Sequence, residues 1–233
     1  MTAESGSQQL AAEELSEINI EDDIEELTPA EVLKIATQTM VHENVAPVLL
    51  PHKTEYFDVL VGQIEHLEKN IASEPDKTRI SITAHRMELY RIGYIVNTYF
   101  RTRLVKIEAS PLEVLNEHAE RVKQGRDPLM DQRELAFAES LHALNIHHFS
   151  NSFLHIIPEG LRAYPVPRRL QNQRKGRVFI EVLKENLEDI AIPDMSEPEV
   201  DADVIVSLKK GSRYLVPFQS VEEHLAKNNI ILL

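Results

Sequence analysis

One predicted helix carries more apolar surface than a small domain can cover by itself. It runs from about Asp76 to about Ile107, and its apolar residues recur at steps of three, four and seven, the spacing of helix faces. Because a helix that is apolar on two sides needs cover on two sides, the pattern predicts packing against other chains. The first stripe is Ile82, Leu89, Ile92, Val96, Phe100, Leu104 and Ile107, and the second is Ile80, Ala84, Met87, Tyr94 and Ile95.

Composition excludes several classes of protein. The 233 residues are 42% hydrophobic and 27% charged, a balance that is typical of a globular protein with one or two domains. The chain contains no Cys and no Trp. The absence of Cys removes disulfides, thiolate metal sites and cysteine nucleophiles. No apolar run approaches the roughly 20 residues of a membrane-spanning helix, and the first ten residues lack the features of a signal peptide. We therefore expect a soluble intracellular protein.

The net charge of -13 is unevenly distributed. Ten acidic residues precede the first basic residue, Lys34, so the rest of the chain is close to neutral. Affinity for duplex DNA rests on clustered Lys and Arg, so direct phosphate binding by the whole chain is not expected. Two basic patches nevertheless leave a helical DNA-binding module open as an alternative. They are Arg101, Arg103 and Lys106 on the long helix, and Arg168, Arg169, Arg174, Lys175 and Arg177 in a later loop.

The chain divides into four predicted segments. Residues 1–26 form an acidic tail that we expect to be disordered when free. Residues 27–157 form a helical domain, 158–176 a linker rich in Pro and polar residues, and 177–233 a small β-rich domain. The predicted fold class is therefore α+β, with a mainly α-helical N-terminal bundle. A β module of this size buries little core by itself, which again favours assembly.

Local signals support these segments. Thr28 and Glu31 have the spacing of a capping box with Pro29 at the first helical position, and Asp131 and Glu134 form a second capping pair. In the tail, Ile18, Ile20, Ile24 and Leu27 give a short amphipathic peptide. This peptide either docks in the groove of a partner or forms the first turn leading into the fold.

Catalytic signatures are largely absent. The seven glycines form no phosphate loop, and no zinc-protease or nucleophile-elbow motif occurs. Glu139 and His142 have the spacing of a di-iron ligand pair, but such sites need a second pair, and the chain has none. The adjacent His147 and His148 point to different faces of a helix, and with His155 we interpret them as interface or core-edge residues. We therefore expect that the protein has no enzymatic activity and binds no metal and no cofactor.

Several short runs, in their order along the chain, resemble the GINS complex of eukaryotic DNA replication, and within it the Sld-five type of subunit. The resemblance covers nearly everything after the acidic tail. It rests on Leu27-Thr-Pro-Ala-Glu31, Arg91-Ile-Gly-Tyr94, Tyr99-Phe-Arg-Thr-Arg-Leu-Val-Lys-Ile-Glu108, Glu134-Leu-Ala-Phe-Ala138, Leu208-Lys-Lys-Gly-Ser212 and Ile230-Ile-Leu-Leu233.

The resemblance implies a non-catalytic structural subunit of a nuclear heterotetramer. With the three other GINS subunits it would join Cdc-forty-five and the Mcm hexamer in the active replicative helicase, its β domain docking between subunits. Ile230 to Leu233 would be an inner strand of that domain. The tail peptide would bind the trimeric adaptor called Ctf-four or And-one through Ile18, Ile20, Ile24 and Leu27. The implied residues of the helical core or subunit interface are Tyr94, Tyr99, Arg101, Arg103 and Leu104.

Overall fold

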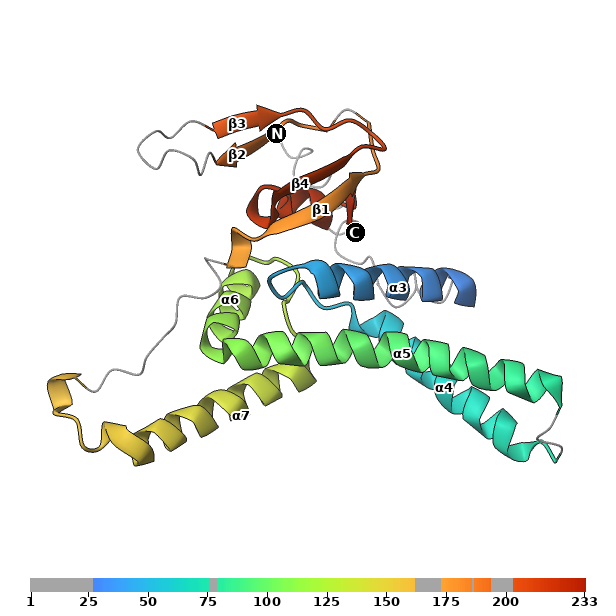
Figure 1. Ribbon diagram of the computed structural model, residues 1–233. Coiled ribbons are helices and arrows are strands. Elements are labelled where there is room, and N and C mark those ends of the chain that lie inside the picture. The colour runs from blue at the N-terminus through green and yellow to red at the C-terminus, as the bar shows by residue number, and fades with distance from the viewer. Residues whose placement is uncertain (1–26, 76–78, 162–172, 186, 194–202) are drawn as a thin grey trace, which may run out of the picture. The chain divides into compact units, whose positions relative to one another are not determined.

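The computed structural model describes residues 27–75, 79–161, 173–185, 187–193 and 203–233. Helices occupy the first part of the chain, and short antiparallel strands occupy the last part (Figure 1), which confirms the predicted α+β class. The described residues form two compact units, 27–37 with 53–94 and 38–52 with 95–233. The predicted acidic tail and most of the predicted linker lie outside the described residues.

The long helix, predicted from about Asp76 to about Ile107, runs from Ile80 to Ala109. The capping boxes explain two of the starts. The Thr28 N–H donates to Glu31 Oε2 at 2.9 Å, and the Asp131 N–H donates to Glu134 Oε2 at 3.2 Å. The helical elements are α3 (Pro29–Val45), α4 (Thr54–Ser73), α5 (Ile80–Ala109), α6 (Pro111–Lys123) and α7 (Gln132–Phe149), followed by a π-helical turn η1 (Ser150–Leu154) and a 3-10 turn η2 (Glu159–Leu161).

Helix α5 has both buried and exposed apolar residues. Its residues up to Tyr94 belong to the first unit, and those from Ile95 onward belong to the second. In the first unit Ile82 and Ile92 are buried, whereas Ile80, Met87 and Tyr94 are exposed. In the second unit the helix buries Ile95, Val96, Tyr99 and Ile107 and exposes Leu104 and Val105. The two stripes are thus not divided quite as predicted, because Leu104 of the first stripe is exposed and Ile95 of the second is buried.

Five strands follow, beginning at the residue where the sequence placed the β domain. They are β1 (Arg177–Val182), β2 (Ile190–Pro193), β3 (Asp203–Val206), β4 (Arg213–Pro217) and β5 (Ile230–Leu232), with a 3-10 turn η3 (Phe218–Ser220) and a short helix α9 (Glu222–Ala226) between β4 and β5. Strands β4, β1 and β5 form one antiparallel sheet in that order, and β2 pairs with β3 in a separate ribbon (Figure 1). The predicted boundary between domains stays a prediction, since the two compact units divide the chain differently.

The central strand of the larger sheet is β1. Its partners are fixed by the register: Phe179 pairs with Leu215 of β4, and Ile180 pairs with both Tyr214 of β4 and Leu232 of β5. The implied inner position of Ile230 to Leu233 is therefore wrong. Among the described residues β5 pairs with β1 alone and is an edge strand, although Ile230 and Leu232 are buried. An apolar sequence favours burial of a strand, but it does not specify the number of hydrogen-bonded neighbours.

The hydrophobic core of the strands extends into the helical part of the same unit. Ala46 and Val48, in the connection between α3 and α4, are buried together with residues of β1, β4, β5 and α9. The segment entering β1 also lies close to this connection: a Cβ added at Gly176 would be 3.6 Å from Cβ of Pro47. Ionic contacts join the same parts, since Arg121 of α6 donates to Glu222 of α9 at 3.0 Å. Residues 38–52 therefore complete the core of the β module within this chain.

Candidate functional site

A fully buried arginine lies at the centre of an ionic cluster in the second unit. The Nε and Nη2 atoms of Arg103, on α5, donate to the two carboxylate oxygens of Glu134 at 2.7 and 2.8 Å. Nη1 donates to Glu43 Oε2 at 3.0 Å, and the carbonyl oxygens of Leu50 and Leu129 each accept a further bond at 2.8 Å. All five guanidinium donors therefore have acceptors, which is the condition for burying this charge.

Lys106 extends the cluster by one helical turn. Its Nζ donates to Glu43 Oε1 at 2.6 Å and to the carbonyl oxygen of Val48 at 2.9 Å. Burial lowers the pKa of Lys106, and the charge of Glu43 opposes this effect. Burial would also lower the pKa of Arg103, but the hydrogen bonds to Glu134 and the charge of Glu43 raise the pKa above its usual value. Two cations and two carboxylates thus form a neutral group that joins α3, the α3–α4 connection, α5 and α7.

Tyr99 lies beside the cluster on α5. Its ring centroid is 5.4 Å from Cζ of Arg103, within the range of a cation–π contact, and its ring meets that of Phe100 edge-on. Tyr99 and Arg103 are both fully buried inside the chain. Their side chains therefore support the surface rather than form it.

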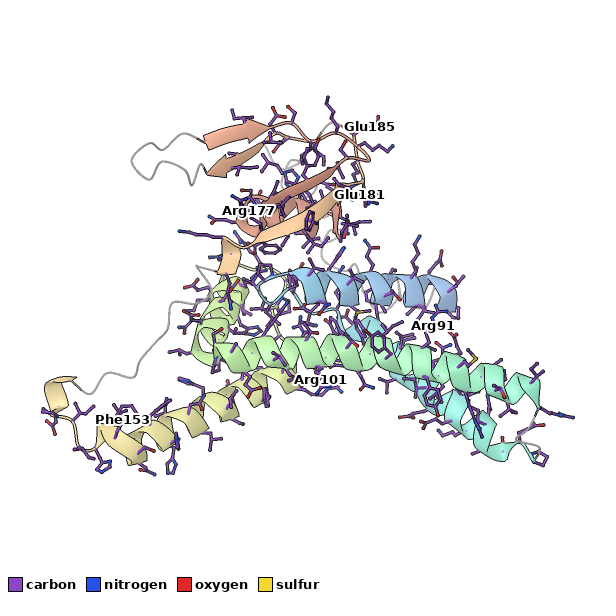
Figure 2. The ribbon with its side chains drawn as sticks, in the orientation of Figure 1. Arg91, Arg101, Phe153, Arg177, Glu181 and Glu185 are labelled. Carbon is purple, nitrogen blue, oxygen red and sulfur yellow. The ribbon has the colours of Figure 1, made fainter. Side chains whose placement is uncertain are left out.

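The other three residues implied as subunit contacts are accessible. Tyr94 is 66% exposed, Leu104 is 38% exposed, and Arg101, labelled on α5 in Figure 2, is exposed as well. The interface prediction itself stays a prediction for all five residues, because a single chain holds no subunit boundary.

The structure changes the interpretation of the basic patches. Arg103 and Lys106 form ion pairs within the buried cluster. Arg101 is therefore the exposed member of the patch on the long helix. In the later patch Arg174 forms an ion pair with Glu117, whereas Lys175 and Arg177 are exposed. Arg168 and Arg169 lie outside the described residues. Neither patch presents the row of free cations that phosphate binding requires in the described part of the chain.

Sequence reasoning missed one aromatic residue on the exposed part of α5. Tyr90 is 70% exposed and lies one helical turn before Tyr94, and Met87 lies one turn before Tyr90 and two turns before Tyr94. The spacing of four residues between the two tyrosines was the available signal. Large aromatic and Met side chains in water are typical of surfaces that another protein covers.

Helix α7 and the turns after it carry a second exposed apolar set that the sequence did not separate from the core. Ala138 is buried on α7, but most of the other large apolar residues are accessible. Phe153, labelled beyond the end of α7 in Figure 2, belongs to this set. The exposed residues are Phe137, Leu144, Ile146, Phe153 and Ile156. The signal was an apolar pattern wider than one helix face.

The histidines of this region do not form a metal centre. Glu139 is exposed and His142 is half-buried, and His147, His148 and His155 are exposed. Within the described ranges no group of three or more His, Cys, Asp or Glu side chains could hold a metal ion. Likewise, none of the helices described is long and apolar enough to cross a membrane.

The predicted adaptor peptide falls almost entirely outside the description. Ile18, Ile20 and Ile24 are not among the described residues, and Leu27 is the first residue that is described. Leu27 is half-buried where the chain enters α3. Its role as an anchor stays a prediction.

These features define a class: an α+β protein with large apolar side chains exposed on two helices and an ionic cluster buried in its second unit. No family model matches the chain. Curated relatives do. The human DNA replication complex GINS protein SLD5 is 31% identical over 215 residues, covering 89% of this chain and 91% of the relative. The rat protein of the same name is 30% identical with the same coverage, and the Xenopus laevis protein is 26% identical over 94% of this chain and 97% of its own. The chain belongs to the SLD5 family of GINS proteins.

Proposed function

We propose that this chain is a non-catalytic structural subunit of a GINS heterotetramer in DNA replication. The names of its relatives as DNA replication complex proteins support the role. The observation that carries the proposal is the set of large apolar side chains left exposed on two helices. Tyr90 and Tyr94 lie on α5, and Leu144 and Ile146 lie on α7. Exposing such residues is unfavourable, and covering them with partner subunits would bury their apolar area.

Membership of the SLD5 family supports the choice of partners. The three other GINS subunits would cover the exposed helix faces, and the assembled tetramer would join Cdc-forty-five and the Mcm hexamer in the replicative helicase. Such a role places the protein in the nucleus. The contribution of this chain would be binding, with no chemical step.

Within this proposal the five implied residues have two different tasks. Tyr94, Arg101 and Leu104 would touch a partner subunit directly, because their side chains are accessible. Tyr99 and Arg103 would act from beneath, by fixing α5 against the α3–α4 connection and the start of α7. An accessible tyrosine or arginine at the centre of an interface is a common source of binding energy.

Expression with and without the three other GINS subunits tests the assembly. We expect the full-length chain to co-purify with them in equal amounts, and Tyr94→Ser combined with Leu144→Ser to reduce recovery of the complex at least about tenfold. The matched control is Tyr94→Phe, which keeps the ring and should assemble normally. Both variants should unfold at the same urea concentration as the parent. A stable monomer that ignores the other subunits would overturn the proposal.

The tail peptide requires a separate experiment. We propose that Ile18, Ile20, Ile24 and Leu27 bind the trimeric adaptor Ctf-four or And-one in a groove, with the acidic neighbours providing charge complementarity. A labelled peptide of residues 17–27 should bind the adaptor, and the same peptide with Ile20→Ala and Ile24→Ala should not. Equal binding by the two peptides would remove this part of the proposal and leave the tetramer unaffected.

The DNA-binding alternative makes an opposite prediction. A module acting through Arg101, Lys175 and Arg177 would bind duplex DNA as a lone chain, with an affinity that falls steeply with salt. We expect weak binding, because the acidic chain offers few free cations among the described residues.

A further inference from the structure

The outer face of the β4–β1–β5 sheet carries an apolar row that no described residue covers. Phe179 is 57% exposed at the centre, its cross-strand partner Leu215 is 48% exposed, and Leu233 is 44% exposed on the other side. The Leu233 N–H donates to the Phe179 carbonyl at 3.1 Å, so the three side chains lie on neighbouring strands in register. The opposite face, with Val178, Ile180 and Val182, forms the core.

Cations border this row. Arg177 and Lys175 are exposed and form no ion pair with any described residue, and Arg177 lies two residues before Phe179 on the same face. At the other end Arg213 is exposed and is bonded to Glu181 at 3.0 Å. Figure 2 shows Arg177 and Glu181 labelled along β1. Since Glu181 neutralises Arg213, Arg177 gives the outer face an excess of one positive charge beside its three apolar side chains.

Residues 17–26 of the chain have the complementary chemistry. The segment contains six carboxylates and no basic residue, together with Ile18, Ile20 and Ile24. A peptide of this kind places apolar side chains on a sheet face and carboxylates near a cationic rim, which gains both apolar burial and Coulomb attraction. Phosphate backbones fit less well, because the apolar row would then remain in water.

We propose that the outer face of the β4–β1–β5 sheet is a docking site for an acidic aliphatic peptide, and that residues 17–26 of this chain are its occupant. The site is separate from the exposed faces of α5 and α7 and does not depend on assembly with other subunits. Occupation of the sheet would keep Ile20 and Ile24 from any other partner. Binding of the segment by the sheet and by a second protein would thus compete.

The test is a titration with a fluorescent synthetic peptide of residues 17–26. The receptor is the full-length chain carrying Ile20→Ser and Ile24→Ser, so that its own segment does not compete. We expect saturable binding that weakens as salt is raised, about tenfold weaker binding after Phe179→Gln with Leu215→Gln, and a smaller loss after Arg177→Glu. Leu144→Ser, on α7, is the control and should leave the affinity unchanged.

A second measurement keeps the result interpretable. The sheet variants should unfold at the same urea concentration as the receptor, because the replaced side chains are already half exposed. Absence of saturable binding would overturn the proposal. So would equal affinity for the Ile20→Ser, Ile24→Ser peptide, equal affinity of the sheet variants, or saturation that tracks dimerisation of the receptor in ultracentrifugation.

Discussion

Arg103 and Glu134 form a two-pronged ion pair inside the protein, with Nε and Nη2 of the arginine 2.7 and 2.8 Å from the two carboxylate oxygens. The pair joins the last third of α5 to the first turn of α7, 31 residues later in the chain. Glu134 also accepts the N–H of Asp131, so one carboxylate both caps α7 and neutralises a buried charge.

Removing the guanidinium should be severely destabilising. Arg103→Met leaves Glu134 buried without its cation and Glu43 with Lys106 alone, and we expect a loss of about 3–5 kcal/mol in the free energy of unfolding. Arg103→Lys should recover only part of this, because an ammonium cannot bond both oxygens of Glu134 in a fixed plane. Urea unfolding measures both. Arg101→Met, on the exposed side of α5, is the control and should change stability by less than about 0.5 kcal/mol. Equal effects at the two positions would contradict the role of the cluster.

The connection between α3 and α4 should be needed for stable folding of the β4–β1–β5 sheet. Val48→Asp places an unpaired charge in the core shared with β1 and β5, and this should cost several kcal/mol, on the order of a buried unpaired ion. Hydrogen exchange should then show loss of amide protection at Ile180 and Leu232. Val59→Asp, at a half-exposed position of α4, should leave this protection intact. Unchanged protection in both variants would show that the strands fold without residues 38–52.

His118 should make stability depend on pH near neutrality. Burial and the nearby charge of His52 lower the pKa of His118 from 6.5, and its Nδ1 accepts the Met130 N–H at 3.2 Å, which requires the neutral ring. As the pH falls from 6.5 toward the lower pKa of the folded state, the unfolded chain takes up the proton first, so stability is lost over that interval. His118→Gln should flatten the urea midpoint between pH 7.5 and 5.5 relative to the parent. Parallel profiles for the two proteins would contradict the assignment.

Two glycine substitutions should change the stability of the protein in opposite directions. Gly211 has φ +74° in the turn before β4, and its N–H donates to the Val182 carbonyl at 2.8 Å. Gly211→Ala should destabilise the protein by about 1–2 kcal/mol, because a side chain is strained in this left-handed conformation. Gly62→Ala, inside α4 with open space around the added Cβ, should stabilise it by about 0.5–1 kcal/mol. Thermal melts of the two variants should shift in opposite directions.

Local signals in the sequence predicted most of the elements correctly. Thr28 and Asp131 marked helix starts, and the runs beginning at Arg177 and Ile230 became strands. The order of the strands in the sheet could not be predicted from the sequence, because the length and apolar character of a strand do not specify which strands pair with it. The edge position of β5 was missed for this reason.

The buried cluster was also missed, although a signal existed. Arg103 lies seven residues after Val96 and four before Ile107, which puts it on the buried face of α5 rather than on the exposed one. A cation at a core position requires an acidic partner, but the sequence does not identify it. Glu43 is 60 residues away, and the nearest acids along the chain, Glu31 and Glu55, are exposed and half-buried. Only the packing of three helices selects it.

The same cluster constrains the order of events during synthesis. Arg103 needs a glutamate made 60 residues earlier and another made 31 residues later, and the loops between them must close before any of the charges leaves water. A nascent chain that has not yet produced Glu134 holds an arginine with two of its five hydrogen bonds missing. The residues of the second unit up to about 130 therefore gain little stability by folding early, and the helical part of that unit should become cooperative only after the start of α7 has left the ribosome.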